Sequence, residues 1–351
     1  MKTGLSITQW ASEIERQAKA KSDYIVDTRS LTLNESLELE IQENRFPLQS
    51  LAHKQIAQRL DIPARYYDKM RESSPALLRE NVNHWLASKP EKRMIRTLDG
   101  EARAFLSDRY QRIDNNHVVE AVIPILSQIP GLEVKSCQVT PSKLYLKAVS
   151  TETRLLVPGS KRVGDYVESG LMITNSEVGQ GALSIQPFFH FLVCTNGMVR
   201  NREGLRAYHV GGRQGVGVDV WDILSDDTKR LEDKATLAKI RDIVAASMDR
   251  VRFEETVALM GEKTQNEITG DVPNAIKKAG EILKLTDEES SSVLRHLISG
   301  GDLSQYGLMN AVTRTAEDLD SYDRATELET MGGMILDLPR SQWEVISRQA
   351  A

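Results

Sequence analysis

The sequence lacks most features that identify a site or a compartment by themselves. Its 351 residues include only two cysteines, Cys137 and Cys194, which do not form the CxxC spacing of a zinc site. No run of about 18 apolar residues occurs, so no membrane-spanning helix is expected. The N-terminal stretch carries acidic residues and has no continuous apolar segment, unlike a secretory signal. We expect a cytoplasmic protein without a membrane partner or a disulfide framework.

Catalytic signatures are also lacking. Asp108, Asp114 and Glu177, with His117 or His190, could hold a divalent ion for phosphodiester cleavage, but their spacing matches no recognised pattern. Capping of a helix fully explains Asp114, because it lies at the start of an expected helix. We therefore assign no catalytic residue, no cofactor and no metal.

Charge is unevenly distributed along the chain. The formal net charge is −5, but residues 141–215 hold 9 Lys+Arg against 5 Asp+Glu, and residues 216–351 hold 16 against 26. A basic middle suits an anionic partner. The acidic last third suits an interaction or oligomerisation segment, although a solvated helical face is the more frequent reason for such charge.

Hydrophobic periodicity predicts an α+β protein in three parts. Residues 1–90 are expected to be a mainly helical N-terminal segment packed on the core, with helices at 7–20, 47–60 and 74–88. Residues 91–215 form a β-rich core, and residues 216–351 form an acidic helical region with helices at 228–248, 271–285, 287–298 and 305–319. A hinge is expected at the glycine-rich segment 210–217, which lacks the GK[ST] ending of a phosphate-binding loop.

The core is expected to hold a mainly antiparallel sheet. Asp99-Gly100 favours a hairpin between strands at 93–98 and 103–110. A helix at 116–129 follows, and further strands are expected at 132–139, 143–149, 167–174 and 183–194. The connections are too short for parallel crossovers. In the last region, capping boxes are expected at Thr286 with Glu289 and at Ser341 with Glu344.

Basic side chains of the core suggest a nucleic-acid interface. The strand at 143–149 places Lys143, Tyr145 and Lys147 on one face. Further basic residues lie in expected loops near the sheet: Lys161, Arg162, Arg200, Arg202, Arg206 and Arg213. A basic track with rings on which bases stack is how single-stranded nucleic acid is held. The alternative for the lysine face is plain solvation.

The phenylalanines of the same region could supply such rings. Phe189 and Phe191 alternate with His190, so the two rings should share one face of their strand. Core packing is the more frequent role of such residues. Cys194 at the end of this strand is expected to be a buried small hydrophobe.

Three stretches resemble the phage/plasmid-like protein family of mobile elements: RTLDGEARAFLSDRYQRIDNNHVVEAVIP at 96–124, NSEVGQGALSIQPFFHFLVCTNG at 175–197, and NVNHWLASKP at 81–90. The resemblance implies a genetic setting but no chemistry. We expect a non-enzymatic, oligomeric protein that binds single-stranded DNA in strand annealing or recombination. The alternative is a module that inhibits a host restriction or defence factor through its acidic C-terminal helices.

Overall fold

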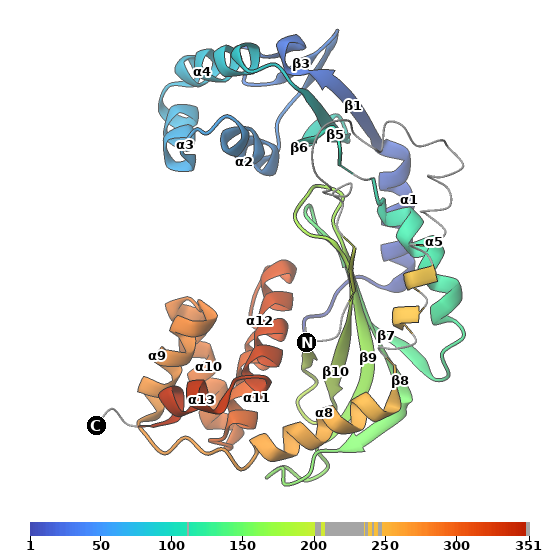
Figure 1. Ribbon diagram of the computed structural model, residues 1–351, viewed down its shortest axis with the longest axis vertical. Coiled ribbons are helices and arrows are strands. Elements are labelled where there is room, and N and C mark those ends of the chain that lie inside the picture. Colours follow the sequence, from blue (N-terminus) through green and yellow to red (C-terminus); the bar gives the residue numbers. More distant parts are fainter. Residues whose placement is uncertain are drawn as a thin grey trace, which may run out of the picture.

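The computed structural model describes residues 1–110, 112–200 and 248–348, the backbone of 205–207, and positions 235, 238–240 and 242–244. The expected α+β class with antiparallel sheets is confirmed. A central sheet separates two groups of helices, and a smaller lobe lies at one end of that sheet (Figure 1). The expected hinge at 210–217 and most of the helix expected at 228–248 lie outside the described residues.

The N-terminal lobe combines helices with two small sheets. Antiparallel strands β1 (Lys21–Asp27), β5 (Lys92–Leu98) and β6 (Glu101–Ser107) form one sheet, and β2 (Leu31–Leu33), β3 (Leu39–Ile41) and β4 (Asn44–Phe46) form the other. The short 3-10 helix η1 (Thr28–Ser30) separates β1 from β2, and the lobe also contains helices α2 (Ser50–Arg59), α3 (Ala64–Ser73) and α4 (Pro75–Ser88). Because β5 pairs with β1 and β6 pairs with β5, the boundary expected at residue 90 falls inside this lobe.

Local signals in this lobe act as the sequence predicts. Asp99 and Gly100 both have positive φ, 53° and 80°, and join β5 to β6 as a tight hairpin. Helix α4 starts with Pro75 at its first position, where a missing N–H costs nothing. The Ser74 side chain, however, makes no capping hydrogen bond.

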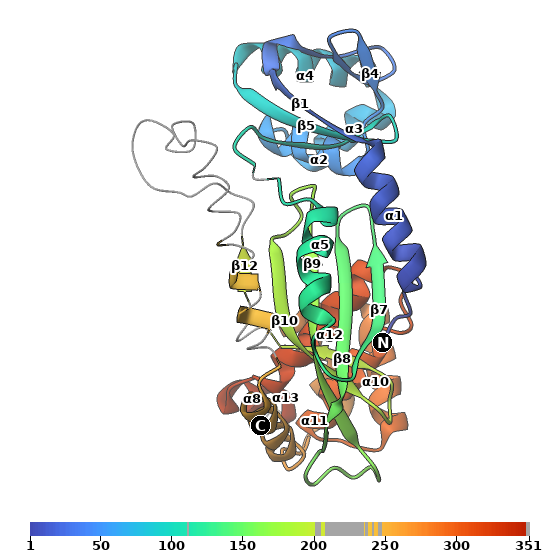
Figure 2. The same ribbon diagram turned by 90° about the vertical axis from the view of Figure 1, so that its right-hand side faces the viewer.

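The central sheet is an antiparallel meander, as expected. Its order is β11 (Gly197–Val199), β10 (Leu183–Phe191), β9 (Tyr166–Asn175), β8 (Leu144–Leu156) and β7 (Leu132–Val139), and β12 (Leu205–Ala207) also pairs with β10. Helices α1 (Ile7–Ala20) and α5 (Asn115–Leu126) lie along one face of this sheet (Figure 2). Helix α1 ends directly before β1, so it links the sheet to the N-terminal lobe.

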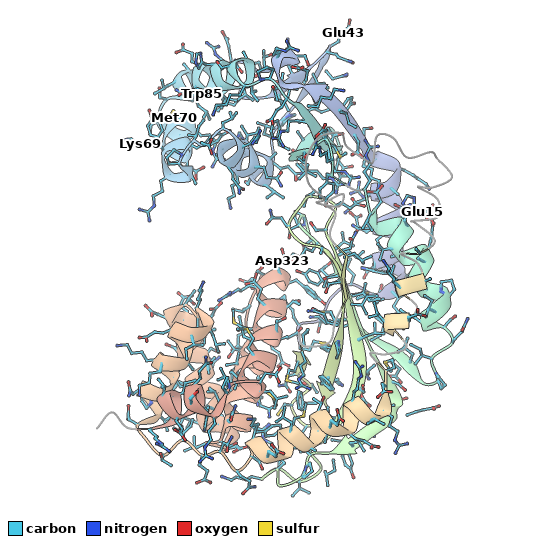
Figure 3. All side chains as sticks on the ribbon, in the orientation of Figure 1. Glu15, Glu43, Lys69, Met70, Trp85 and Asp323 are labelled. Carbon is cyan, nitrogen blue, oxygen red and sulfur yellow. The ribbon has the colours of Figure 1, made fainter. Side chains whose placement is uncertain are left out.

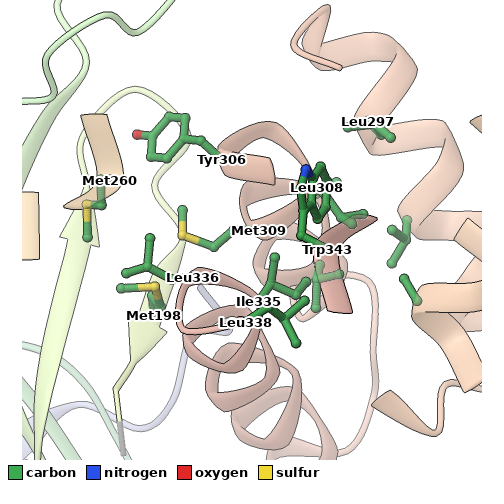
Figure 4. Close-up of a cluster of buried hydrophobic side chains, with 14 of the residues drawn as sticks. Met198, Met260, Leu297, Tyr306, Leu308, Met309, Ile335, Leu336, Leu338 and Trp343 are labelled. Atoms are coloured by element: carbon green, nitrogen blue, oxygen red, sulfur yellow. The ribbon is translucent and has the colours of Figure 1, made fainter. Parts of the chain in front are cut away.

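The C-terminal helices gather at the opposite face and around the lower end of the sheet (Figure 1). These are α8 (Arg250–Lys263), α9 (Val272–Leu283), α10 (Asp287–Gly300), α11 (Gln305–Thr315), α12 (Tyr322–Leu336) and α13 (Arg340–Ser347). Their shared core includes Met309, Leu336 and Trp343 and reaches Met198 on β11 (Figure 4). None of the helices in the described part of the chain is long and apolar enough to cross a membrane.

The two expected capping boxes differ in outcome. Thr286 and Glu289 form the reciprocal pair of hydrogen bonds at the start of α10, which confirms the first. The second is wrong, because α13 begins at Arg340 after Pro339 and Ser341 therefore lies inside the helix.

The two faces of the central sheet differ in polarity. Towards α1 and α5 its three middle strands present mostly aliphatic side chains, namely Leu144, Leu146, Leu171, Ile173, Leu183 and Ile185. Asn175 at the end of β9 lies on the same face and donates to Asn115 of α5 over 2.8 Å. The alternate positions, which point towards the C-terminal helices, are mostly polar: Tyr145, Lys147, Met172, Thr174, Ser184 and Gln186. Apolar packing alone therefore cannot attach the C-terminal helices to this second face of the sheet.

We expect Gly333→Ala to destabilise the protein even though alanine is the better helix former. Gly333 lies on α12 against β11, and an added Cβ would sit 2.1 Å from the Val199 carbonyl oxygen. The free energy of unfolding in urea should fall by about 1–3 kcal/mol, as in other overpacked cores. Gly300→Ala is the control, because its Cβ would meet only the movable end of the Arg162 side chain.

Candidate binding groove between the sheet and helix α12

An open groove of about 450 Å³ lies between the polar face of the sheet and α12. Its floor comes from β8–β10, with Tyr145, Met172, Thr174, Ser184 and Gln186. One wall is α12, with Asp323, Thr326, Glu327, Thr330, Met331 and Met334. Its remaining lining comes from Lys143, Asn175, Ser176, Gly181 and Ala182. A groove of this size and mixed lining can hold a ligand.

One face of α12 supplies its wall. The lining residues recur at three- and four-residue intervals from Asp323 to Met334, which places them along one stripe of the helix. Asp323 lies at the end of α12 nearest the N-terminal lobe (Figure 3). Its carboxylate accepts a hydrogen bond of 2.9 Å from Thr140 and one from Ser142, which both lie in the β7–β8 turn.

A buried ion pair joins α12 to the sheet beside the groove. Lys147 Nζ on β8 lies 2.6 Å from Glu329 Oε2 on α12, and both side chains are 0% exposed. The ammonium also donates to Thr326 Oγ1 over 3.1 Å and lies 4.6 Å from the centre of the Tyr322 ring. Burial lowers the pKa of Lys147, and the charge of Glu329 opposes that shift. The prediction that Lys147 lies on a face open to DNA is therefore wrong.

Tyr145 is also removed from solvent. It is 2% exposed and packs against Tyr322 with ring centres 5.1 Å apart. Burial raises the pKa of the Tyr145 phenol, and the nearby charge of Asp323 adds to that shift. The ring is thus not free to stack on a base, so this part of the predicted face is wrong too. Only Lys143 of the three lines the groove with partial exposure.

One polar group of the groove floor is left without a partner. The Ser184 hydroxyl is buried, with 7% of the residue exposed, and has no hydrogen-bond partner among the described residues. Ser184 shares its strand face with Gln186, since Leu183 and Ile185 point towards α1 and α5. A buried unpaired hydroxyl costs free energy that a ligand could recover.

Three other predicted basic residues, whose side chains the structure describes, do not line this groove. Lys161 pairs with Glu267 at 3.1 Å, and Arg162 donates to the sulfur of buried Cys194. Arg200 donates three hydrogen bonds to Asp337, of which the shortest is 2.8 Å, and one to Thr256 on α8 over 2.9 Å. The side chains of Arg202, Arg206 and Arg213 lie outside the described residues.

The phenylalanines take the core role. Phe189 and Phe191 share one face, as expected, and are 3% and 0% exposed. Phe189 stacks on Phe253 of α8 with ring centres 6.1 Å apart, and Phe191 lies edge-on to Tyr306 of α11. They are therefore unavailable to bases. Cys194 is buried, as expected, and burial raises its thiol pKa.

Two of the carboxylates considered as metal ligands, Asp114 and Glu177, lie close together, but each is paired with cations. Asp114 Oδ2 lies 2.8 Å from Lys21 Nζ, and Asp114 Oδ1 lies 2.6 Å from Arg96, which is 0% exposed. Glu177 pairs with Lys21 and Arg103. These contacts join the N-terminal lobe to the β9–β10 connection and the start of α5, so their role is structural.

The remaining residues weighed for a metal site do not assemble with this pair. His190 contacts Glu168 at 3.2 Å, and burial lowers its pKa despite that carboxylate. Asp108 accepts a hydrogen bond from Ser107, and His117 is exposed on α5. Over the residues that the structure describes, no three His, Cys, Asp or Glu side chains are grouped as metal ligands.

The α12 wall was not identified from the sequence. One sequence pattern in the acidic last third could have identified α12. Ser321 is a helix-capping residue, and the residues buried after it recur at helical spacing: Tyr322, Ala325, Leu328, Glu329 and Gly332. Because a buried charge is costly without a partner, the glutamate in this buried stripe indicates that α12 packs against a cation.

Comparison with known protein families, with curated proteins and with solved structures finds no match. The resemblance to the phage/plasmid-like family stays a prediction.

We expect Lys147→Met to lower the free energy of unfolding by about 3–5 kcal/mol, because it leaves Glu329 charged and buried without its partner. Adding Glu329→Leu should restore most of the loss, since an apolar pair can replace a buried ion pair. Urea unfolding of the two single variants and the double variant measures this. A double variant as unstable as the sum of the singles would contradict it.

The ion cluster at the lobe junction predicts a defined acid sensitivity. Burial alone would raise the pKa of Asp114, but the charges of Arg96 and Lys21 outweigh it and lower that pKa to about 2. The ionised carboxylate therefore stabilises the fold above about pH 4, and this contribution is lost as the pH falls towards 2. Asp114→Asn should cost about 2 kcal/mol at pH 6 and almost nothing near pH 2.

Urea unfolding across this pH range measures the difference. Asp320→Asn, an exposed carboxylate with no ion pair in the described chain, gives the general effect of removing one charge. A wild-type advantage over Asp114→Asn that persists unchanged at pH 2 would rule out the proposed linkage.

Proposed function

We propose that this protein is a non-enzymatic binding protein whose groove between the sheet and α12 holds an extended polypeptide segment of a partner. The observation that carries this proposal is the lining of the groove. A polar floor with an unpaired hydroxyl at Ser184 faces a helix wall that ends in methionines.

The lining suits a peptide in two ways. Thr174 and Ser184 can exchange hydrogen bonds with main-chain N–H and C=O groups, which every peptide offers regardless of sequence. Met331 and Met334 provide flexible apolar surface that adapts to different side chains, and Met334 is 46% exposed. Such surfaces are typical of sites that accept varied partners.

The charges of the groove argue against a phosphate backbone as its ligand. Lys143 is the one cation among its described lining residues, and Asp323 and Glu327 are carboxylates. Arg324 pairs with Glu327 at 2.7 Å, so the remaining charges nearly cancel. Binding of nucleic acid needs several cations along the phosphates, and this lining supplies too few.

The chemistry of the groove fits the second of the two functions expected from the sequence. Proteins that act on DNA carry basic segments, and residues 250–348 hold 18 Asp+Glu against 11 Lys+Arg. With the resemblance to the phage/plasmid-like family as genetic setting, we infer a host restriction or defence factor as the partner. Self-association stays a prediction.

The single-stranded DNA hypothesis also stays a prediction. Its stacking rings and Lys147 are buried, so it depends on Lys143, Lys161, Arg162 and the three arginines outside the described residues. Tests of the groove therefore include a labelled single-stranded oligonucleotide beside peptides.

We expect Met334→Trp to block the groove. The probes are peptides selected on the full-length protein from a random peptide library, and they should share a Lys or Arg. A tryptophan at this exposed groove position should weaken their binding at least about tenfold, by occupying the space between α12 and the floor. Fluorescence anisotropy measures the change.

Ile298→Trp is the matched control, because Ile298 is 56% exposed on α10 and does not line the groove. Equal weakening by both variants, or no selected peptide at all, would refute the peptide groove. Salt-sensitive binding of the oligonucleotide that falls in Lys143→Ala would favour the DNA hypothesis.

A further inference from the structure

Helices α2 and α3 form a compact unit at the outer end of the N-terminal lobe. Only residues 60–63 separate them, and Asp61 in this turn has a positive φ of 55°. The Ile62 amide donates back to the Ala57 carbonyl over 2.9 Å, and the Tyr67 amide donates to the Pro63 carbonyl over 2.9 Å. A turn of three or four residues with one left-handed position is typical of a helix-turn-helix.

Buried side chains fix the second helix against the first. The inward positions of the unit are all at most 9% exposed, namely Ile56, Ala57, Leu60, Ile62, Tyr67 and Met70. His53 on α2 and the Tyr67 hydroxyl on α3 are hydrogen-bonded at 2.8 Å. Burial lowers the pKa of His53 to about 4, so the imidazole is neutral and the contact persists at neutral pH.

Helix α4 completes the support. It packs on α3 and adds Leu78, Val82 and Leu86 to the same hydrophobic core. Helices α2 and α4 therefore hold α3 in place, with one of its faces buried and the other on the surface. Figure 3 shows Lys69 and Met70 on α3 at the outer end of the lobe, remote from Asp323 and the groove.

The outer face of the N-terminal half of α3 is basic and aromatic. Arg65 and Lys69 are exposed and four residues apart, and Tyr66, which is 47% exposed, is three residues from Lys69. These spacings place the three side chains side by side near the start of the helix. An Arg and a Tyr at such positions can contact base edges and phosphates.

These cations also differ from their neighbours in being unpaired. Arg59 pairs with Glu91, and Arg71 pairs with Asp68 at 3.3 Å. Within the described chain, neither Arg65 nor Lys69 has a carboxylate at ion-pair distance. Two unpaired cations beside a helix N-terminus, whose free amides favour anions, match the charge of a phosphate backbone.

We propose that α2 and α3 are a helix-turn-helix that binds duplex DNA, with the N-terminal half of α3 in the major groove. Arg65 and Tyr66 would then lie at base edges, and Lys69 at a phosphate, as recognition helices dock. This site is separate from the groove at α12 and does not depend on the peptide hypothesis.

Anisotropy titrations of the full-length protein with a labelled random-sequence duplex over a range of salt concentrations test the proposal. Arg65→Ala with Lys69→Ala should weaken duplex binding and lower the steepness of its log–log salt dependence by about 1–2, because about one unit is lost per phosphate contact. The control pair Lys277→Ala with Arg340→Ala removes the same charge from exposed sites on α9 and α13 and should change neither quantity.

Selection of preferred sites from a random duplex library tests the major-groove contact. The wild type should enrich a defined sequence, and Tyr66→Ala should alter that sequence without altering the salt dependence, since tyrosine carries no charge. Absence of duplex binding at low salt would overturn the proposal. Equal weakening by the control pair, or the same enriched sequence in the Arg65→Ala and Lys69→Ala protein, would also overturn it.

Discussion

The cation of Lys147, placed in the middle of the sheet, is the constraint on which the second half of the structure depends. A buried charge is tolerated only with a partner, and Glu329 on α12 is that partner. Helix α12 must therefore lie across the polar face of β8, and Tyr322 and Thr326 complete the surroundings of the ammonium. Because the neighbouring sheet positions are also polar, the two surfaces do not close completely, and the groove is the space that remains.

Much of the fold follows from local signals in the sequence. The helix at 7–20, the Asp99-Gly100 hairpin and the strand at 132–139 need only periodicity and turn chemistry, and the structure confirms them. The alternation along β8 was also read correctly, with Tyr145 and Lys147 on one face. Alternation shows which residues share a face but not what covers that face, and the burial of Lys147 depends on a helix about 180 residues away.

The candidate site was harder to predict for the same reason. The central region does contain the cations and aromatic rings from which a nucleic-acid site was predicted. However, Phe189 packs on α8 and Lys147 pairs with a glutamate of α12, and both helices lie far away in the sequence. Asp114 and Glu177 do come close together in the fold. Only the structure shows that Lys21 pairs with both carboxylates and that Arg96 pairs with Asp114. A cluster of carboxylates has catalytic meaning only once its cations are known.

The β9–β10 connection belongs to both ends of the molecule. Ser176, Gly181 and Ala182 line the groove, whereas Glu177 and Val178 contact the N-terminal lobe through Arg103, Gln55 and Leu106. The groove and the N-terminal lobe therefore share contacts with one connection of seven residues. If the groove and the N-terminal lobe each bind the ligand proposed for them, thermodynamic reciprocity requires that each binding event change the free energy of the other by the same amount.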